Sequence, residues 1–369
     1  MKKYMDLLNE NIAKLNKIDY LIMGIMVLIY GILSFYKLGD LKGINTFYTF
    51  NNDEIVINLK NENYISKMRY YTGINTGDIS IYYLNTDGKY TYLKDFTSNS
   101  VLCFEDIDIN IATTSLKFSS NEYHVTLGDI GLYDNFNNRL NIINDNSPIT
   151  DEMNLIPENI NYMNSIYFDE IYFARSAYEY THGLNAFEWT HPPIGKLLMS
   201  LPILIFGYSP FNVRLMGNLA GILIIPIMYI LCMKIFKKRR YALLGALIMM
   251  FDNFHFSHTR IALVDSFEIL FMLLSTIFMK NYLDLKKDDL FQKKAINLLL
   301  SGLFMGLSIG VKWNPCYFAL ALAIVFFYHL IEEYHFNIIK YCKKNINLYK
   351  IFMIIYYGLL IPIFIYYIS

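Results

Sequence analysis

The sequence predicts an α-helical integral membrane protein of about seven spans, with a β-sandwich inserted outside the cytoplasm. Two observations carry this prediction. Hydrophobic residues make up 54% of the 369 residues and gather into long runs. A polar region of short alternating runs interrupts them over residues 40–165. The formal net charge is zero, so no basic excess points to a nucleic-acid partner.

Residues 1–39 predict a cytoplasmic N-terminus and a first transmembrane helix. Residues 1–17 are polar and rich in lysine, and an apolar run follows over 20–36. This run is long for a signal peptide and lacks a small-residue cleavage site, which favours a retained signal anchor. The flanking lysines predict that the N-terminus is cytoplasmic.

Residues 40–165 predict an extracytoplasmic β-sandwich followed by a polar linker. Period-two alternation with frequent turns is typical of that fold. The alternating runs are 54–59, 78–83, 89–93, 114–118 and 123–127. Two stretches, GDISIYYLNTDGKYTYL and VTLGDIGLYD, resemble the discoidin-like, galactose-binding-like sandwiches. Sugar or acceptor binding and a structural role both stay open, and the structural role is favoured because fold does not fix function.

The four cysteines do not form a recognisable metal or redox motif. None of them lies in a CxxC pair, so a zinc knuckle is not indicated. Cys103 is alone in the predicted external domain, which predicts no disulfide there.

Beyond residue 211, apolar runs alternate with charged loops. The predicted spans are 211–236, 241–256, 266–282, 295–311, 316–331 and 351–367. Basic clusters follow the second, fourth and sixth spans, on the side of the N-terminus, as the positive-inside rule requires. The same parity places the loops that carry Arg260 and Lys312 outside, together with residues 166–210. The candidate functional residues are therefore expected on one face.

The stretch 167–196, YFDEIYFARSAYEYTHGLNAFEWTHPPIGK, concentrates charge beside these spans. It holds the acidic pair Asp169 and Glu170, then Arg175, Glu188 and the run HPPIGK. Charge next to a bilayer is expensive and usually functional. A polar loop that anchors the neighbouring helices is the alternative. Two helices, over about 168–181 and from the Pro-Pro pair to about 206, are expected within or just after this stretch.

The order of these motifs resembles the protein O-mannosyltransferase family. FDE, an aromatic residue with Ala-Arg, a turn, HPPIGK and then a helix with Arg214 follow one another as in that family. SHTRIALVDSF (257–267) and GLSIGVKWN (306–314) resemble it in the same order. The family consists of polyprenyl-phosphate-sugar-dependent glycosyltransferases of the GT-C fold. The resemblance implies that residues 166–210 are the catalytic juxtamembrane loop, with its helices at the membrane surface.

The resemblance implies an enzyme that moves a hexose, expected to be mannose, from a polyprenyl-phosphate carrier to Ser/Thr hydroxyls of secreted or membrane proteins. It implies a multi-pass protein of the plasma membrane with an extracytoplasmic active site. It also implies more spans than residues 211–369 supply as transmembrane helices 2–7. An incomplete GT-C domain is therefore expected, from a fragment or from one half of a split enzyme with a C-terminal partner chain.

The resemblance assigns the catalytic base to Asp169. Such a base takes the proton of the acceptor hydroxyl. Glu170 is expected to raise the pKa of Asp169 by like-charge coupling or to orient it. The alternative for Glu170 is a carboxylate that complements the helix dipole.

Four basic side chains are candidates for binding the phosphate of the donor, where negative charge develops on the leaving oxygen. They are Arg214, Arg260, Lys196 and His191. Snorkelling is the alternative for the arginines, a headgroup anchor for Lys196 and a turn-holding role for His191. Asp265 is a candidate partner of Arg260.

Glu188, Trp189 and Arg175 are the candidates for acceptor or sugar contacts. Many family members have an acidic residue two positions before the His of HPP, but Trp189 stands there. Glu188 is one position further back and is expected to substitute. Anchoring in an interfacial aromatic belt is the alternative for Trp189. No cofactor is implied beyond the donor, and a divalent metal stays open because His255 and His258 lack a dense ligand set.

Three other functions remain as alternatives. The same fold transfers sugar to lipid or wall glycan in related enzymes. A non-catalytic membrane receptor that binds glycan through the β-sandwich is the alternative from another class. A transporter is disfavoured, because the sequence has neither an inverted repeat nor paired broken helices.

Overall fold

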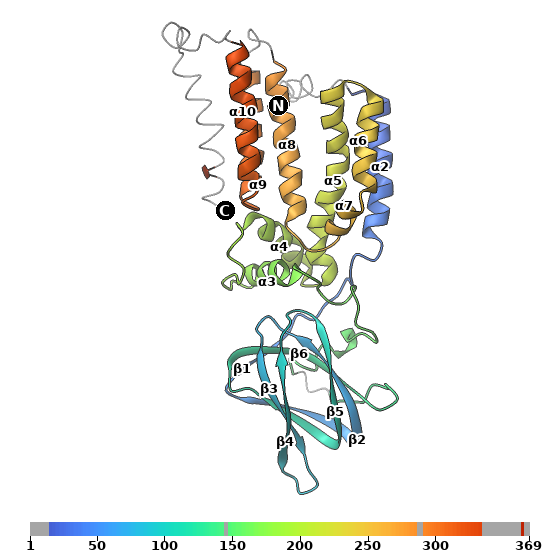
Figure 1. Ribbon diagram of the computed structural model, residues 1–369. Coiled ribbons are helices and arrows are strands. Elements are labelled where there is room, and N and C mark those ends of the chain that lie inside the picture. Colours follow the sequence, from blue (N-terminus) through green and yellow to red (C-terminus); the bar gives the residue numbers. More distant parts are fainter. Residues whose placement is uncertain (1–14, 144–146, 286–290, 334–362, 365–369) are drawn as a thin grey trace. The chain divides into compact units, whose positions relative to one another are not determined.

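The computed structural model describes residues 15–143, 147–285, 291–333 and 363–364 (Figure 1). The chain divides into two compact units. A helical unit comprises Met1–Tyr36, Glu188–Met199 and Arg214–Ser369, and a sheet unit comprises Lys37–Phe187 and Ser200–Val213. Helices α4 (Ile194–Phe206) and α5 (Pro210–Phe236) contribute residues to both.

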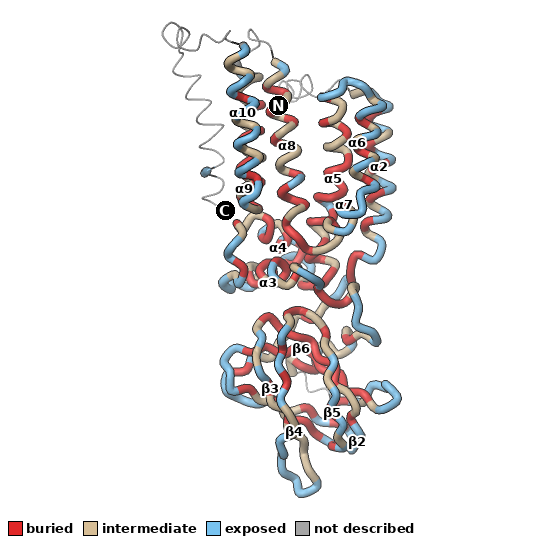
Figure 2. Tube along the Cα trace, in the orientation of Figure 1, coloured by how far each residue is buried: buried red, intermediate tan, exposed pale blue. Residues whose placement is uncertain are grey.

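Four helices are long and apolar enough to cross a membrane. They are Lys17–Phe35, Pro210–Phe236, Asp265–Leu283 and Pro315–Glu332. These helices, labelled α2, α5, α8 and α10, coincide with the spans predicted over 20–36, 211–236, 266–282 and 316–331 (Figure 1). Their outer faces are apolar and exposed, as on α2, where Leu21 and Ile32 are both more than 60% exposed (Figure 2). Apolar side chains that face outward over a whole helix are expected where lipid is the solvent.

The span predicted over 241–256 is instead two helices. α6 (Arg239–Phe251) has 13 residues and α7 (Asn253–His258) follows it. Asp252 separates them, because its carboxylate accepts hydrogen bonds from the amides of Phe254 and His255 at 3.4 and 3.0 Å and caps α7. Thirteen residues rise only about 20 Å, less than the hydrocarbon core.

The rest of the predicted topology is only partly described. α9 (Phe291–Ile309) lies where the span 295–311 was expected, but its first turn carries Gln292, Lys293 and Lys294 and it is not among the four apolar helices. The N-terminal lysines before residue 15, the basic segment 340–350 and most of the span 351–367 lie outside the described residues. The count of seven spans and their orientation therefore stay predictions.

Two sets of contacts hold the helices together. α2, α5 and α6 share a core in which Ala242 and Ala246 are fully buried. Between α8 and α9, Ser275 and Ser301 each donate a hydroxyl hydrogen bond to the other's backbone carbonyl, at 2.8 and 3.0 Å. Small residues and hydroxyl pairs of this kind let membrane helices approach closely.

A buried carboxylate also links α2 to α5 and α6. Asp19 is 1% exposed and accepts hydrogen bonds from the Tyr229 hydroxyl and from Arg239 Nε, both at 2.7 Å. Asn16 and Asp19 form a capping box at the start of α2. The charge of Asp19 is therefore balanced by a cation from another helix.

The sheet unit contains six antiparallel strands: β1 (Tyr48–Asn51), β2 (Glu54–Thr72), β3 (Gly77–Leu84), β4 (Tyr90–Ser98), β5 (Phe104–Ser119) and β6 (Tyr123–Tyr133). The five alternating runs coincide with β2 to β6, and only the run 89–93 starts one residue before its strand, so the predicted strands are confirmed. Figure 2 shows β6 buried along most of its length.

These strands form one curled sheet, in the order β1-β6-β2-β5-β3-β4, and the two-sheet sandwich is not confirmed (Figure 1). The long strand β2 pairs with β5 from Glu54↔Ser119 to Tyr71↔Phe104, and its second half also pairs with β6. Irregularities between Asn58 and Asn63 and between Ile65 and Lys67 interrupt the β2–β5 register. Bulges increase local bending and twist, so the sheet covers its own apolar core.

Replacing Asp19 with Ala is expected to lower the stability of the helical unit, because the buried Tyr229 hydroxyl loses its hydrogen-bond acceptor and the capping box of α2 is broken. Thermal unfolding in detergent measures this, with Lys17→Ala, an exposed change in the same helix, as the control. Equal melting temperatures for the two variants would contradict the structural role given to Asp19.

Candidate functional site

The acidic pair begins helix α3 (Glu170–Thr181). Glu170 is fully buried, and its Oε2 accepts a hydrogen bond from the amide of Tyr167 at 2.6 Å. Asp169 is half-buried at the N-cap position, and its side chain makes no capping hydrogen bond. The two carboxylates are thus separated by role: Glu170 closes the turn, and the carboxylate of Asp169 is not used in capping.

Backbone strain marks this turn. Phe168 has a φ of 56°, in the left-handed region that bulky residues rarely adopt. Such a conformation costs of the order of 1–3 kcal/mol and persists only where the surroundings fix it. The bond from the Tyr167 amide to Glu170 spans Phe168 and Asp169 and supplies that constraint. The predicted base therefore lies in a turn held under strain.

Arg175 is engaged inside the sheet unit. Its Nε donates to Glu179 Oε1 at 2.8 Å, and its Nη2 donates to Asn75 Oδ1 at 3.1 Å. Its guanidinium lies 3.9 Å from the ring centre of Phe187. Glu179 also accepts a hydrogen bond from the amide of Phe187 at 2.7 Å. These contacts join α3 to the loop between β2 and β3 and to the segment that follows α3. They favour a positioning role for Arg175 over sugar binding.

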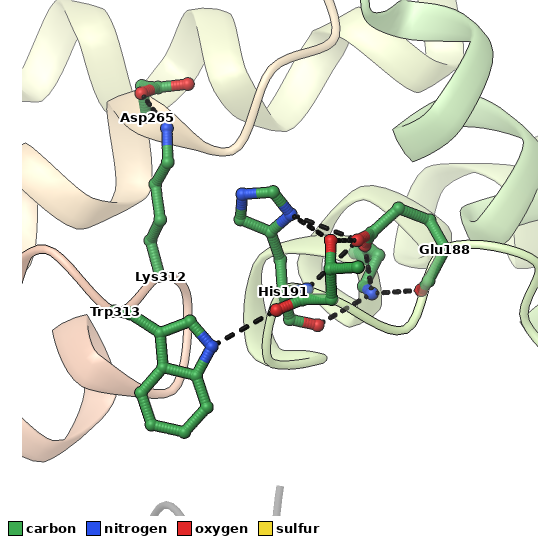
Figure 3. A network of polar contacts seen from close by, with 7 residues as sticks. Glu188, His191, Asp265, Lys312 and Trp313 are labelled. Atoms are coloured by element: carbon green, nitrogen blue, oxygen red, sulfur yellow. Dashed lines mark hydrogen bonds and ion pairs between the residues drawn. The ribbon is translucent and has the colours of Figure 1, made fainter.

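The HPP segment is organised by a buried ion pair (Figure 3). Lys196 is 1% exposed and Glu188 8%, and Lys196 Nζ lies 2.7 Å from Glu188 Oε2. Lys196 Nζ also donates to the backbone carbonyls of Glu188 and His191, at 2.6 and 2.9 Å. An ammonium group has three N–H donors. All three are engaged within residues 188–196, which favours a structural role for Lys196 over a phosphate ligand.

The second oxygen of Glu188 holds the rest of the loop. Its Oε1 accepts hydrogen bonds from the backbone amide of His191 at 2.9 Å and from the Thr190 hydroxyl, and His191 Nδ1 lies 3.0 Å away (Figure 3). Burial alone raises the pKa of a carboxyl. Here the hydrogen bonds from Lys196, Thr190 and His191 outweigh burial and lower the pKa of Glu188 to about 2. Glu188 is therefore a carboxylate at neutral pH.

The loop before α10 attaches to this segment. The indole Nε1 of Trp313 donates to the carbonyl of Thr190 at 3.1 Å (Figure 3). The amide of Ile194 donates to the carbonyl of Gly310 at 3.0 Å. A Cβ on Gly310 would stand 2.4 Å from Ile194 Cδ1, so a larger residue there would force the Ile194 side chain to move. Trp313 is thus a residue of the site that the sequence did not predict, although it lies in the GLSIGVKWN segment.

The SHTRIALVDSF segment joins the same group of motifs. A Cβ on Gly195 would stand 2.7 Å from Val264 Cγ1, so this segment packs directly on the start of α4. Asp265, at the start of α8, forms an ion pair with Lys312 at 2.8 Å (Figure 3). The expected pairing of Asp265 with Arg260 is therefore wrong, because the loop before α10 brings Lys312 to that carboxylate. Three motifs that are far apart in the sequence meet in the helical unit.

Arg214 and Arg260 have different surroundings. Arg214 is fully buried at the start of α5. On the same helix a Cβ on Gly217 would lie 3.7 Å from the carbonyl oxygens of Ile261 and Leu263, so the segment after Arg260 crosses this part of α5. Arg260 donates from Nε and Nη2 to the carbonyls of Ser34 and Tyr36, at 3.1 and 2.6 Å, and so binds the C-terminal end of α2.

The remaining candidates are placed as follows. Trp189 is 82% exposed. His255 is buried, with Nε2 3.2 Å from the carbonyl of Gly221 and its ring stacked on Tyr30. His258 stacks on Phe254. Among the described residues, neither histidine belongs to a group that could hold a metal ion.

Comparison with known proteins identifies relatives of this architecture. Residues 206–368 match the family model described as dolichyl-phosphate-mannose-protein mannosyltransferase. This region is therefore similar to protein O-mannosyltransferases. Of the predicted site, Arg214 and Arg260 lie within the matched region and Asp169 lies before it.

Relatives from bacteria, mammals and yeast share this similarity. The polyprenol-phosphate-mannose–protein mannosyltransferase of Mycobacterium tuberculosis H37Rv is 25% identical over 43% of this chain and 35% of its own length. Protein O-mannosyl-transferase 1 of Rattus norvegicus is 23% identical over 47% of this chain and 26% of its own. The chain therefore spans about a quarter to a third of these relatives. A solved structure, the Saccharomyces cerevisiae Pmt1–Pmt2 protein O-mannosyltransferase complex bound to the sugar donor, is similar with a TM-score of 0.47 and 20% identity, over 55% of this chain and 29% of that one.

The Glu188 network predicts a pH-dependent stability. The pKa of Glu188 is lowered from 4.5 to about 2 on folding, so the unfolded state takes up the proton first as the pH falls. Its contribution to the free energy of unfolding is complete above about pH 4.5 and is lost between there and about pH 2. The melting temperature of the wild type is expected to fall further between pH 7 and pH 3 than that of Glu188→Gln. Glu332→Gln, an exposed change in the same unit, should behave like the wild type. Parallel pH profiles for the wild type and Glu188→Gln would contradict the prediction.

Proposed function

We propose that this chain is part of a glycosyltransferase that moves mannose from a polyprenyl-phosphate carrier to Ser/Thr hydroxyls of proteins. The match of residues 206–368 to the mannosyltransferase family carries the proposal. The packing of HPPIGK, SHTRIALVDSF and GLSIGVKWN segments against one another supports it, because these are the stretches that resemble that family. The enzyme belongs in the plasma membrane, with a cytoplasmic N-terminus and with the sheet unit and the reaction outside the cell.

Asp169 acts as the general base in this proposal. Its carboxylate accepts the proton of the Ser or Thr hydroxyl as that oxygen bonds to the anomeric carbon of mannose. The bond from the anomeric carbon to the phosphate oxygen breaks, and polyprenyl phosphate leaves with the electron pair. The absence of a capping hydrogen bond on the Asp169 side chain supports this role. Glu170 positions the base, because its buried carboxylate closes the turn.

Cations must stabilise the charge that builds on the leaving phosphate. We assign this role first to Arg214, since a fully buried guanidinium acts through a low local dielectric. Arg260 contributes chiefly by fixing the end of α2, because two of its donors are held by backbone carbonyls. Lys196 and His191 act indirectly, through the shape of the HPP loop.

Glu188 and Trp189 have different proposed roles on the side where the acceptor binds. Glu188 is a positioning residue, because both of its oxygens are engaged by the HPP loop. Trp189 follows it directly and is 82% exposed, so its ring offers a free face to a sugar or an acceptor peptide. The protein acceptor and the lipid-linked donor are the partners this assignment needs.

Sugar transfer in native membranes tests the function. Labelled polyprenyl-phosphate-mannose and a Ser/Thr-rich acceptor are supplied to the wild type and to Asp169→Asn. The wild type is expected to transfer mannose and the variant to lose about 100-fold or more of the rate, as removal of a general base does. Asp87→Asn, an exposed change in the turn between β3 and β4, is the matched control.

Three results would contradict the proposal. A full rate in Asp169→Asn would exclude Asp169 as the base. Transfer of the labelled sugar to lipid or wall glycan instead of the peptide would show that the acceptor is not a protein hydroxyl. Glycan binding by the wild type without any transfer would favour a receptor.

A further inference from the structure

Three carboxylates meet at one place in the sheet unit, away from the acidic pair at α3. Asp129 lies in β6, and Asp151 and Glu152 directly precede the short helix η1 (Met153–Leu155). One carboxylate oxygen from each lies within 4.8 Å of the other two. Like charges at this separation repel one another, so the arrangement is costly unless something neutral or positive separates them.

Each carboxylate commits one oxygen to a protein donor. Asp129 Oδ1 accepts a hydrogen bond from the Glu152 amide at 2.9 Å, and Asp151 Oδ1 lies 3.0 Å from the Thr46 hydroxyl, which it shares with Glu152 Oε2 at 2.9 Å. Glu152 Oε2 accepts from the amides of Asn45 and Thr46, at 2.7 and 3.1 Å. The side chains are therefore held in place, while one oxygen of each has no hydrogen bond within the described part of the chain.

A second and independent observation concerns burial. Asp129 is fully buried, and its Oδ2 has no hydrogen-bond partner. An unpaired buried carboxylate oxygen is expensive, and such groups normally coordinate metals or pair with a cation. Burial, together with the charges of Asp151 and Glu152, raises the pKa of Asp129 to about 7, although the hydrogen bond from the Glu152 amide and the charge of Arg139 oppose this rise.

We propose that Asp129, Asp151 and Glu152 bind a calcium ion. The ligands are all oxygens, the donor set of hard cations, and the group contains neither His nor Cys as zinc sites usually do. Oxygens on opposite sides of a calcium ion stand about 4.8 Å apart, twice the usual Ca–O distance of about 2.4 Å. The separations in this group do not exceed that limit.

The position of the site suggests what the ion does. Glu152 and Asp151 bind residues 45 and 46, which lie just ahead of β1, and Asp129 belongs to the buried strand β6. A bound ion joins these segments and removes the repulsion among the three carboxylates. Because it binds only the folded arrangement, it stabilises the sheet unit by mass action.

Calcium binding to the full chain in detergent tests the proposal. Calorimetric titration with calcium chloride and thermal unfolding, with and without a chelator, are measured for the wild type. Calcium is expected to bind with one ion per chain and to raise the melting temperature by several degrees, and magnesium is expected to bind more weakly.

Two variants and a control locate the site. Asp129→Asn is expected to fold in the chelator, since a neutral amide is not repelled by Asp151 and Glu152, and to lose the calcium-dependent rise. Asp151→Asn, an exposed change that leaves the core intact, should weaken calcium binding at least 10-fold. Asp87→Asn should keep the rise of the wild type. A wild-type melting temperature unchanged by calcium, a rise that survives in both site variants, or a preference for magnesium would overturn the proposal.

Discussion

The buried ion pair between Glu188 and Lys196 is the contact on which the arrangement of the site depends. A lysine that is 1% exposed requires a partner, and here Glu188 and two carbonyls engage all three of its N–H donors. The other oxygen of Glu188 fixes His191 and Thr190. The carbonyl of Thr190 in turn receives the indole of Trp313, so one carboxylate determines where the loop before α10 attaches.

This constraint separates residues that shape the site from residues that are proposed to act in it. The pairs Glu188–Lys196 and Asp265–Lys312 neutralise their own charges, and Arg260 is held by the end of α2. Arg214 is fully buried at the start of α5, and the side chain of Asp169 makes no capping hydrogen bond; these are the residues to which the proposed function assigns chemistry. At Gly195 and Gly310 a Cβ would meet the side chains of Val264 and Ile194 at less than 3 Å, so a larger residue at either position would force these side chains to move.

Local patterns could be predicted from the sequence, and non-local pairings could not. The alternation within β2 to β6 and the hydropathy of α2, α5, α8 and α10 are properties of neighbouring residues, so these elements were found. The break at Asp252 was missed because hydropathy does not register a capping carboxylate. The single sheet, the pairing of Asp265 with Lys312, and the meeting of Asp129 with Asp151 depend on tertiary contacts between segments that their own sequences do not specify.

A double-mutant cycle on Glu188→Gln and Lys196→Met tests most directly the claim that this pair organises the site. Melting temperature and the KM for the lipid-linked donor are measured for both single variants and for the double variant. If the pair acts as one structural unit, each single change lowers the melting temperature, and the double change lowers it no further than the worse single one. If Lys196→Met raises the KM for the donor while leaving the melting temperature unchanged, Lys196 binds the phosphate and the structural account is contradicted.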